Sequence, residues 1–298
     1  MNYSKARAIA QQRIKESIKD DKRYKADVAK LYNRTQKDIE REIEAQIERF
    51  ARKEQLSMAE ARKRISKTDV QAFSDTAKQY VKEKDFSDLA NQQLRAYNVT
   101  MRTNRIELLQ ARINLIAVGS ANEEDKMLKD NLFKIASKEY EAQAGILGLG
   151  VPSQSLIQRM VDSIIAMEYE GATFSERIWE NQTQLVEEVN RAVRRTIIQG
   201  KHPRTASTDL MKLIDKNVFP NARYAADRIA ITETARAQTL VQERAIKDAG
   251  IDKKVWIAEP SACDICSGLD GKVMKLDDHN YTIPQHPFCR CSFAAYVD

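Results

Sequence analysis

The stretch from Met1 to Val118 contains neither glycine nor proline. These residues are the two strongest breakers of regular structure, so their absence from more than a third of the chain predicts helices turned only by polar residues. Seven apolar residues recur there at three-, four- and seven-residue spacing, which places them on one stripe of a helix. They are Val28, Leu31, Tyr32, Ile39, Ile43, Ile47 and Phe50. The stripe needs a partner surface, either in the protein's own bundle or on another protein.

Polar and glycine-rich segments suggest where these helices begin and end. Ser57 with Glu60, and Thr68 with Asp69, have the form of helix starts. The longest helix is expected from about residue 87 to 118, with a break at Gly119 and a further helix over residues 122–144. Three glycines and a proline fall within Gly145–Pro152, which predicts a hinge or domain boundary.

Shorter helices are expected after this boundary, over residues 153–169, 175–199, 205–216 and 221–249. Beyond them the sequence favours short β-strands at 254–257, 271–274 and 291–297. Three such strands are too short to be stable without a covering helix or a metal ion. The predicted fold is mainly α, of the α+β kind. It has a long helical N-terminal bundle or extension (1–150), a compact helical domain (151–250) and a small β module stapled by zinc (251–298).

All four cysteines lie in this last segment, at Cys263, Cys266, Cys289 and Cys291, with His286 beside them. No apolar run marks a secretion signal or a membrane span, so synthesis in a reducing cytoplasm is expected, where clustered cysteines bind metal more often than they form disulfides. The spacing predicts one structural zinc ion. Zinc takes four ligands, so Cys263 and Cys266 form the firm pair and one of His286, Cys289 and Cys291 is spare; spacing alone does not choose.

Two enzyme classes have related cysteine patterns. A zinc deaminase would need a glutamate motif before the first cysteine pair, and that motif is missing. A nuclease of the HNH kind is closer, because Asp278, His279 and Pro284 lie between two cysteine pairs. The later asparagine and histidine of such a site are absent. We keep this nuclease, and a stand-alone DNA-binding protein, as alternatives, and assign no catalytic residue.

Positive charge is concentrated at the start of the chain. Residues 1–67 hold 19 Lys and Arg against 11 Asp and Glu, whereas the whole chain has a net charge of +6. Such a segment can neutralise phosphates and bind double-stranded DNA without reading its sequence. The alternative is that these charges only solvate a long helix.

A set of motifs in the second half of the chain points to one family. They are Arg228-Ile-Ala-Ile-Thr-Glu-Thr-Ala-Arg236, Lys254-Val-Trp256, Leu269-Asp-Gly-Lys272 and His286-Pro-Phe-Cys-Arg-Cys291. Together with the cysteines they closely resemble the phage Mu F-like minor head proteins, also called head morphogenesis proteins, over about residues 155–295.

The resemblance implies a non-enzymatic virion protein at the portal vertex of the phage head, acting in head assembly and in packaging or delivery of the genome. It makes the portal protein the first expected partner, with scaffold or major capsid protein as further candidates. By four-residue steps Arg228, Thr232 and Arg236 share a helix face, with Glu233 in reach of Arg236. We interpret these four residues as a buried polar brace between the helix and the zinc module. Arg290 is expected to offset the negative charge of the thiolates.

Overall fold

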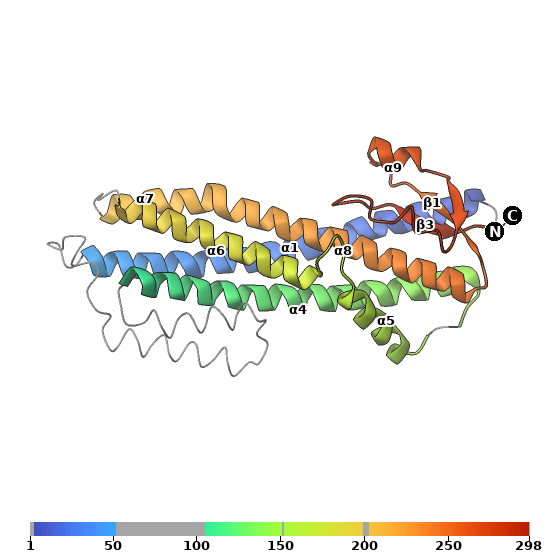
Figure 1. Ribbon diagram of the computed structural model, residues 1–298, viewed down its shortest axis with the longest axis horizontal. Coiled ribbons are helices and arrows are strands. Elements are labelled where there is room, and N and C mark those ends of the chain that lie inside the picture. Colours follow the sequence, from blue (N-terminus) through green and yellow to red (C-terminus); the bar gives the residue numbers. More distant parts are fainter. Residues whose placement is uncertain (1–2, 52–104, 151, 199–202, 298) are drawn as a thin grey trace. The chain divides into compact units, whose positions relative to one another are not determined.

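A computed structural model describes residues 3–51, 105–150, 152–198 and 203–297 (Figure 1). The helix starts predicted at Ser57 and Thr68, and residues 87–104 of the longest predicted helix, lie outside the described residues, as do the side chains of Ile47 and Phe50.

Helices make up most of the described chain, and one small antiparallel sheet lies near its C-terminus, so the predicted fold class is confirmed (Figure 1). The helices are α1 (Tyr3–Ala51), α4 (Arg105–Leu147), α5 (Gln154–Ala166), α6 (Phe174–Ile198), α7 (Pro203–Leu213), α8 (Phe219–Asp248) and the short α9 (Asp264–Gly268), with a π-helical turn, η2 (Ile214–Val218). The strands are β1 (Lys253–Ile257), β2 (Val273–Lys275) and β3 (Ser292–Ala295). None of the described helices combines the length and apolar character needed to cross a membrane.

The break predicted at Gly119 is wrong, because α4 runs through it without interruption. A lone glycine costs a helix only about 1 kcal/mol relative to alanine, which packing readily offsets. Here Val118, Ser120 and Ala121 are all buried, and the Ser120 hydroxyl lies 3.0 Å from Thr35 Oγ1 of α1.

The predicted gap between the helices at 205–216 and 221–249 is also wrong. The π-helical turn η2 joins α7 directly to α8, and the Phe219 N–H donates to the Ile214 carbonyl five residues earlier. A π turn accommodates one extra residue without ending a helix, so the chain stays helical through Pro220.

The chain forms two compact units. The first comprises Met1–Asp27, Lys126–Arg177 and Ala226–Asp298, and the second comprises Val28–Asp125 and Ile178–Ala225. The Gly145–Pro152 segment does separate α4 from α5. The division into residues 1–150, 151–250 and 251–298 remains a prediction.

The apolar stripe of α1 forms part of the core of the second unit. Its five described members, Val28, Leu31, Tyr32, Ile39 and Ile43, are each at most 3% exposed. Trp179 is buried too, as a core residue should be. For these stripe residues the alternative of a docking face for another protein is therefore wrong: the stripe packs within the protein itself.

The first unit contains the sheet, with strand order β2-β1-β3 and both pairs antiparallel. Because side chains alternate along a strand, the sheet has two different faces. Val255, Ile257 and Ala294 pack on the start of α1, against Ala6, Ala10 and Ile14; Figure 1 shows β1 and β3 beside that end of the helix. Trp256 and Phe293 point to the other face and pack with the cysteines.

Candidate metal centre

Two tight turns carry the donor atoms. In the first, Cys263 is the N-cap of α9 and its carbonyl accepts a hydrogen bond from the Ser267 N–H at 2.8 Å, so the thiols of Cys263 and Cys266 fall on one side of a helical turn. In the second, the Cys289 N–H donates to the His286 carbonyl at 3.1 Å. Both turns therefore present two donors separated by two residues.

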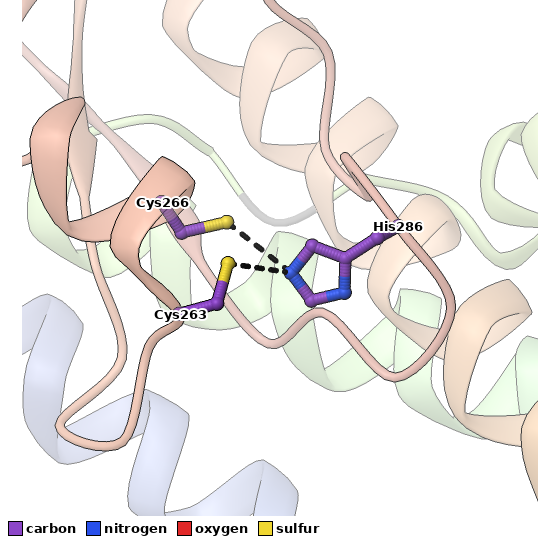
Figure 2. A group of neighbouring side chains, drawn as sticks. All are labelled: Cys263, Cys266 and His286. Carbon is purple, nitrogen blue, oxygen red and sulfur yellow. Dashed lines mark hydrogen bonds between the residues drawn. The ribbon is translucent and has the colours of Figure 1, made fainter.

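The two turns meet with their donor atoms close together. Figure 2 shows the sulfur atoms of Cys263 and Cys266 pointing at Nε2 of His286, at 3.3 and 3.4 Å. The sulfur atoms of Cys266 and Cys289 lie 3.9 Å apart. In a tetrahedral zinc site, bond lengths of about 2.3 Å to sulfur and 2.0–2.1 Å to nitrogen place the donors about 3.6–3.8 Å from one another. The observed separations fit that geometry, so the cluster could hold a metal ion.

Cys266 belongs to two overlapping groups of donors. One consists of Cys263, Cys266 and His286, and the other of Cys266, Cys289 and Cys291; within each group all ligand atoms lie within 4.8 Å of one another. The structure thus gathers all five residues that the sequence singled out. Cys263 is exposed, whereas the other three cysteines are buried.

The tautomer of His286 suits metal binding. Its Nδ1 lies 2.8 Å from the carbonyl oxygen of Pro287, and a carbonyl can only accept, so Nδ1 carries the proton. In the neutral ring Nε2 is then an unprotonated lone pair directed at two thiols. A backbone partner of this kind is the usual support for a histidine ligand.

Without a cation, the four thiols cannot all ionise. A hydrogen bond from Cys291 lowers the pKa of Cys289 to about 6, and the backbone N–H of Cys266 lowers the pKa of Cys263. Burial raises the pKa of Cys266 to about 12, and the hydrogen bond to Cys289, followed by burial, raises the pKa of Cys291. A divalent ion would supply the compensating charge and release protons on binding.

An apolar core surrounds the buried thiols. Trp256 and Phe293 are at most 1% exposed and meet edge to face, with ring centroids 5.5 Å apart. Met274 and Ile283 complete the packing around Cys266 and the second cysteine pair. Trp256 and Phe293 therefore cover the core of the module.

The residues interpreted as a brace fall into two groups. Thr232, Glu233 and Arg236 are buried in α8. Arg236 pairs with Glu233 at 2.7 Å and donates to the Ile164 carbonyl of α5 at 2.8 Å. Thr232 Oγ1 accepts a hydrogen bond from the Phe288 N–H at 3.3 Å. Arg228, by contrast, is exposed.

Phe288 lies between His286 and Cys289 and has a φ of 66°, a left-handed conformation that bulky residues rarely adopt. The Thr232 hydroxyl therefore contacts the backbone of the second ligand turn at its most strained residue.

Arg290 has a partner that the sequence did not indicate. It forms a buried ion pair with Asp21 of α1, and its backbone N–H donates to Glu259 at 3.0 Å. The two side chains are only 5% and 10% exposed. Burial outweighs the attraction of the guanidinium and raises the pKa of Asp21 to about 6. Because Asp21 lies near the start of the chain and carries no motif, no sequence signal marks this contact.

Gln242 is a second residue that sequence reasoning missed. Its carbonyl oxygen accepts from the Phe293 N–H at 3.0 Å and from the Ser292 hydroxyl at 3.2 Å, while its amide donates to Glu139 of α4 at 3.1 Å. Arg13 of α1 reaches the same carboxylate at 2.6 Å. This network connects three helices to the edge strand that follows the ligand loop.

Comparison with known families finds a match over the part of the chain that contains the cluster. Residues 187–294 match the family described as Phage Mu protein F like protein, which confirms over this segment the resemblance seen in the sequence. The match includes all five metal-site donors and the motif around Thr232 and Arg236. No curated protein and no solved structure matches the chain. The family match implies a phage head morphogenesis or minor capsid protein.

Proposed function

We propose that this protein is a minor head protein of a tailed phage, located in the virion near the portal vertex, where it acts in head assembly and in packaging or delivery of the genome. The observation that carries the proposal is the family match, which spans the C-terminal part of the helical body and the whole ligand cluster. The proposed role is structural rather than enzymatic. The portal protein is its first candidate partner, ahead of scaffold or major capsid protein.

We further propose that the cluster binds one zinc ion through Cys263, Cys266, His286 and Cys289. The thiolates and imidazole are ligands that zinc prefers, and a closed set of four leaves no position for a reactive water. The equal two-residue spacing in the two turns, and the 3.9 Å separation of the Cys266 and Cys289 sulfur atoms, favour Cys289 over Cys291 as the fourth ligand. Cys291 is then the spare donor, with its sulfur within 4.8 Å of those of Cys266 and Cys289.

In this proposal the role of the metal is structural. It would join the α9 turn to the His286 turn, and so fix a sheet that is too small to be stable alone. Thr232 holds the second turn against α8, and Arg236 with Glu233 connects α8 to α5. These contacts support a bracing role for the three buried residues, and leave Arg228 outside the brace.

The proposed function is tested by locating the protein in phage particles. Mass spectrometry of purified virions and of DNA-free heads should detect it at low copy number relative to the major capsid protein. Co-expression with the portal protein should yield a complex that survives purification, whereas scaffold and major capsid protein tested in parallel should not be required. Absence from particles together with no binding to portal would reject the assignment.

A further inference from the structure

The outward face of α1 in the first unit carries a row of positive charges. Residues 15, 19 and 22 follow one another at four- and three-residue steps, so they lie on one stripe of the helix. All three are lysines, all are exposed, and Arg23 borders them with 80% of its side chain exposed. We call Lys15, Lys19, Lys22 and Arg23 the basic sector. The opposite face of the same turns is buried, at Ile14, Ser17 and Asp21.

Two acidic side chains, Glu16 and Asp20, border this sector. Asp20 pairs with Arg23 at 3.2 Å and with Lys138 of α4 at 3.1 Å. Glu16 accepts a hydrogen bond from Gln12 at 3.0 Å. Among the residues that the structure describes, Lys15, Lys19 and Lys22 form no ion pair, so their charges are available to a partner in solution.

We propose that the basic sector is a binding surface for the phosphate backbone of double-stranded DNA. This inference deepens the function proposed above, since it names the face through which a head protein would contact the packaged genome. Charge complementarity favours this partner: Lys15, Lys19 and Lys22 form a row of exposed cations, and the nearby acids Glu16 and Asp20 lie to one side of that row at 100° per residue. The outward positions flanking them, Gln12 and Ala26, provide no aromatic ring on which an unpaired base would stack.

The dimensions suit a duplex. At about 1.5 Å per residue, Lys15 and Lys22 lie about 10 Å apart along the helix axis. About 10 Å of a DNA duplex carries about three phosphates on each strand. Three lysines can thus meet the phosphates of one strand without distortion of either helix, and contacts of this kind do not depend on base sequence.

The test compares two triple variants of the full-length, metal-loaded protein. The first is Lys15→Gln, Lys19→Gln, Lys22→Gln. The control changes three other exposed lysines, Lys212→Gln, Lys247→Gln and Lys275→Gln, and so removes the same charge elsewhere. Gln and Lys have similar helix propensities, and circular dichroism verifies that α1 is retained. Binding to a fluorescent 30-base-pair duplex is measured by anisotropy from low to moderate salt.

Loss of three phosphate contacts should make the plot of log K against log salt concentration shallower by about 2.7 and weaken binding about tenfold or more at moderate salt. The control should change the slope by less than about 0.9, which is the contribution of one phosphate contact. Lys→Arg at the three sector positions should preserve binding, because the charge remains.

Several results would overturn the inference: no duplex binding by the wild-type protein at low salt, unchanged binding in the sector variant, or equal losses in both variants. A sector variant that keeps DNA binding but loses its complex with the portal protein would show an acidic protein surface to be the partner instead. These assays use isolated protein, so their result is independent of the virion test. DNA binding can be absent from a protein that is found in virions, and it can be present in a protein that is not.

Discussion

The buried pair between Arg290 and Asp21 allows a quantitative test of how α1 is attached to the ligand loop. We predict that Arg290→Met strongly destabilises the protein, because it leaves the buried Asp21 carboxylate without its guanidinium partner. Breaking a buried pair from one side costs about 3–5 kcal/mol. Arg244→Met is the matched control, since the side chains of its 2.9 Å pair with Asp248 are 49% and 27% exposed and the pair should contribute less than about 1 kcal/mol.

The pH dependence of this loss has a defined sign. A carboxyl whose pKa is raised by folding, here from 3.8 to about 6, contributes stability that is present below about pH 4 and is lost as the pH rises through 6. Without Arg290 the pKa of Asp21 should rise further, because the opposing charge is gone. In the Arg290→Met variant the Asp21 carboxyl would then be protonated, and so uncharged, at pH 6.0. The loss of unfolding free energy caused by Arg290→Met should therefore be smaller at pH 6.0 than at pH 7.5.

The assay is urea unfolding of zinc-loaded protein at both pH values, for the two single variants, Asp21→Asn and Arg290→Met, and for the double variant. The double-mutant cycle removes effects that Arg290 has on Glu259 or on the metal site, since these occur with or without Asp21. We expect a coupling energy of about 2 kcal/mol at pH 7.5. A coupling below about 0.5 kcal/mol, or an Arg290→Met loss no larger than that of Arg244→Met, would refute the reasoning.

Three further predictions concern single positions. Thr232→Val should lower the free energy of unfolding by about 1 kcal/mol, because it removes the part-buried hydrogen bond from the Phe288 N–H to the Thr232 hydroxyl, whereas Thr232→Ser should retain most of the stability. Ile43→Asp should unfold the second unit, seen as lost helical circular dichroism, since this side chain is fully buried; a folded variant would contradict its place in the core. Cys289→Ser should lose zinc while Cys291→Ser retains one ion per chain by elemental analysis; the reverse pattern would exchange their roles.

Local patterns explain what the sequence could predict. The absence of glycine and proline predicted long helices because helix propensity depends on each residue and its near neighbours. The two-residue spacing of Cys263 and Cys266 likewise marked a single turn with two donors. His286 and Cys289 repeat that spacing, yet Cys291 offered an equally plausible donor, and the structure was needed to show how the two turns meet.

Long-range contacts account for most of what the sequence did not predict. Gly119 stays helical because Ser120 and its neighbours are buried, with Ser120 against Thr35. The pair of Asp21 with Arg290 joins opposite ends of the chain. Arg228 was placed on one face with Thr232 and Arg236, but it alone of the three is exposed. Every residue from 229 to 237 is buried, including Ala235 at nearly the same helical angle as Arg228, so the exposure of Arg228 reflects its position before this packed stretch and not its face of the helix.

The most direct test of the account is the metal content of the intact protein. Native mass spectrometry of protein purified without added metal should give one zinc ion per chain, with the cysteine thiols protected from alkylation until a chelator is added. Cys263→Ser with Cys266→Ser should bind no zinc and should lose the fold of the β module. A metal-free wild-type protein with a folded module, or a double variant that folds and assembles normally, would contradict the structural role assigned to zinc.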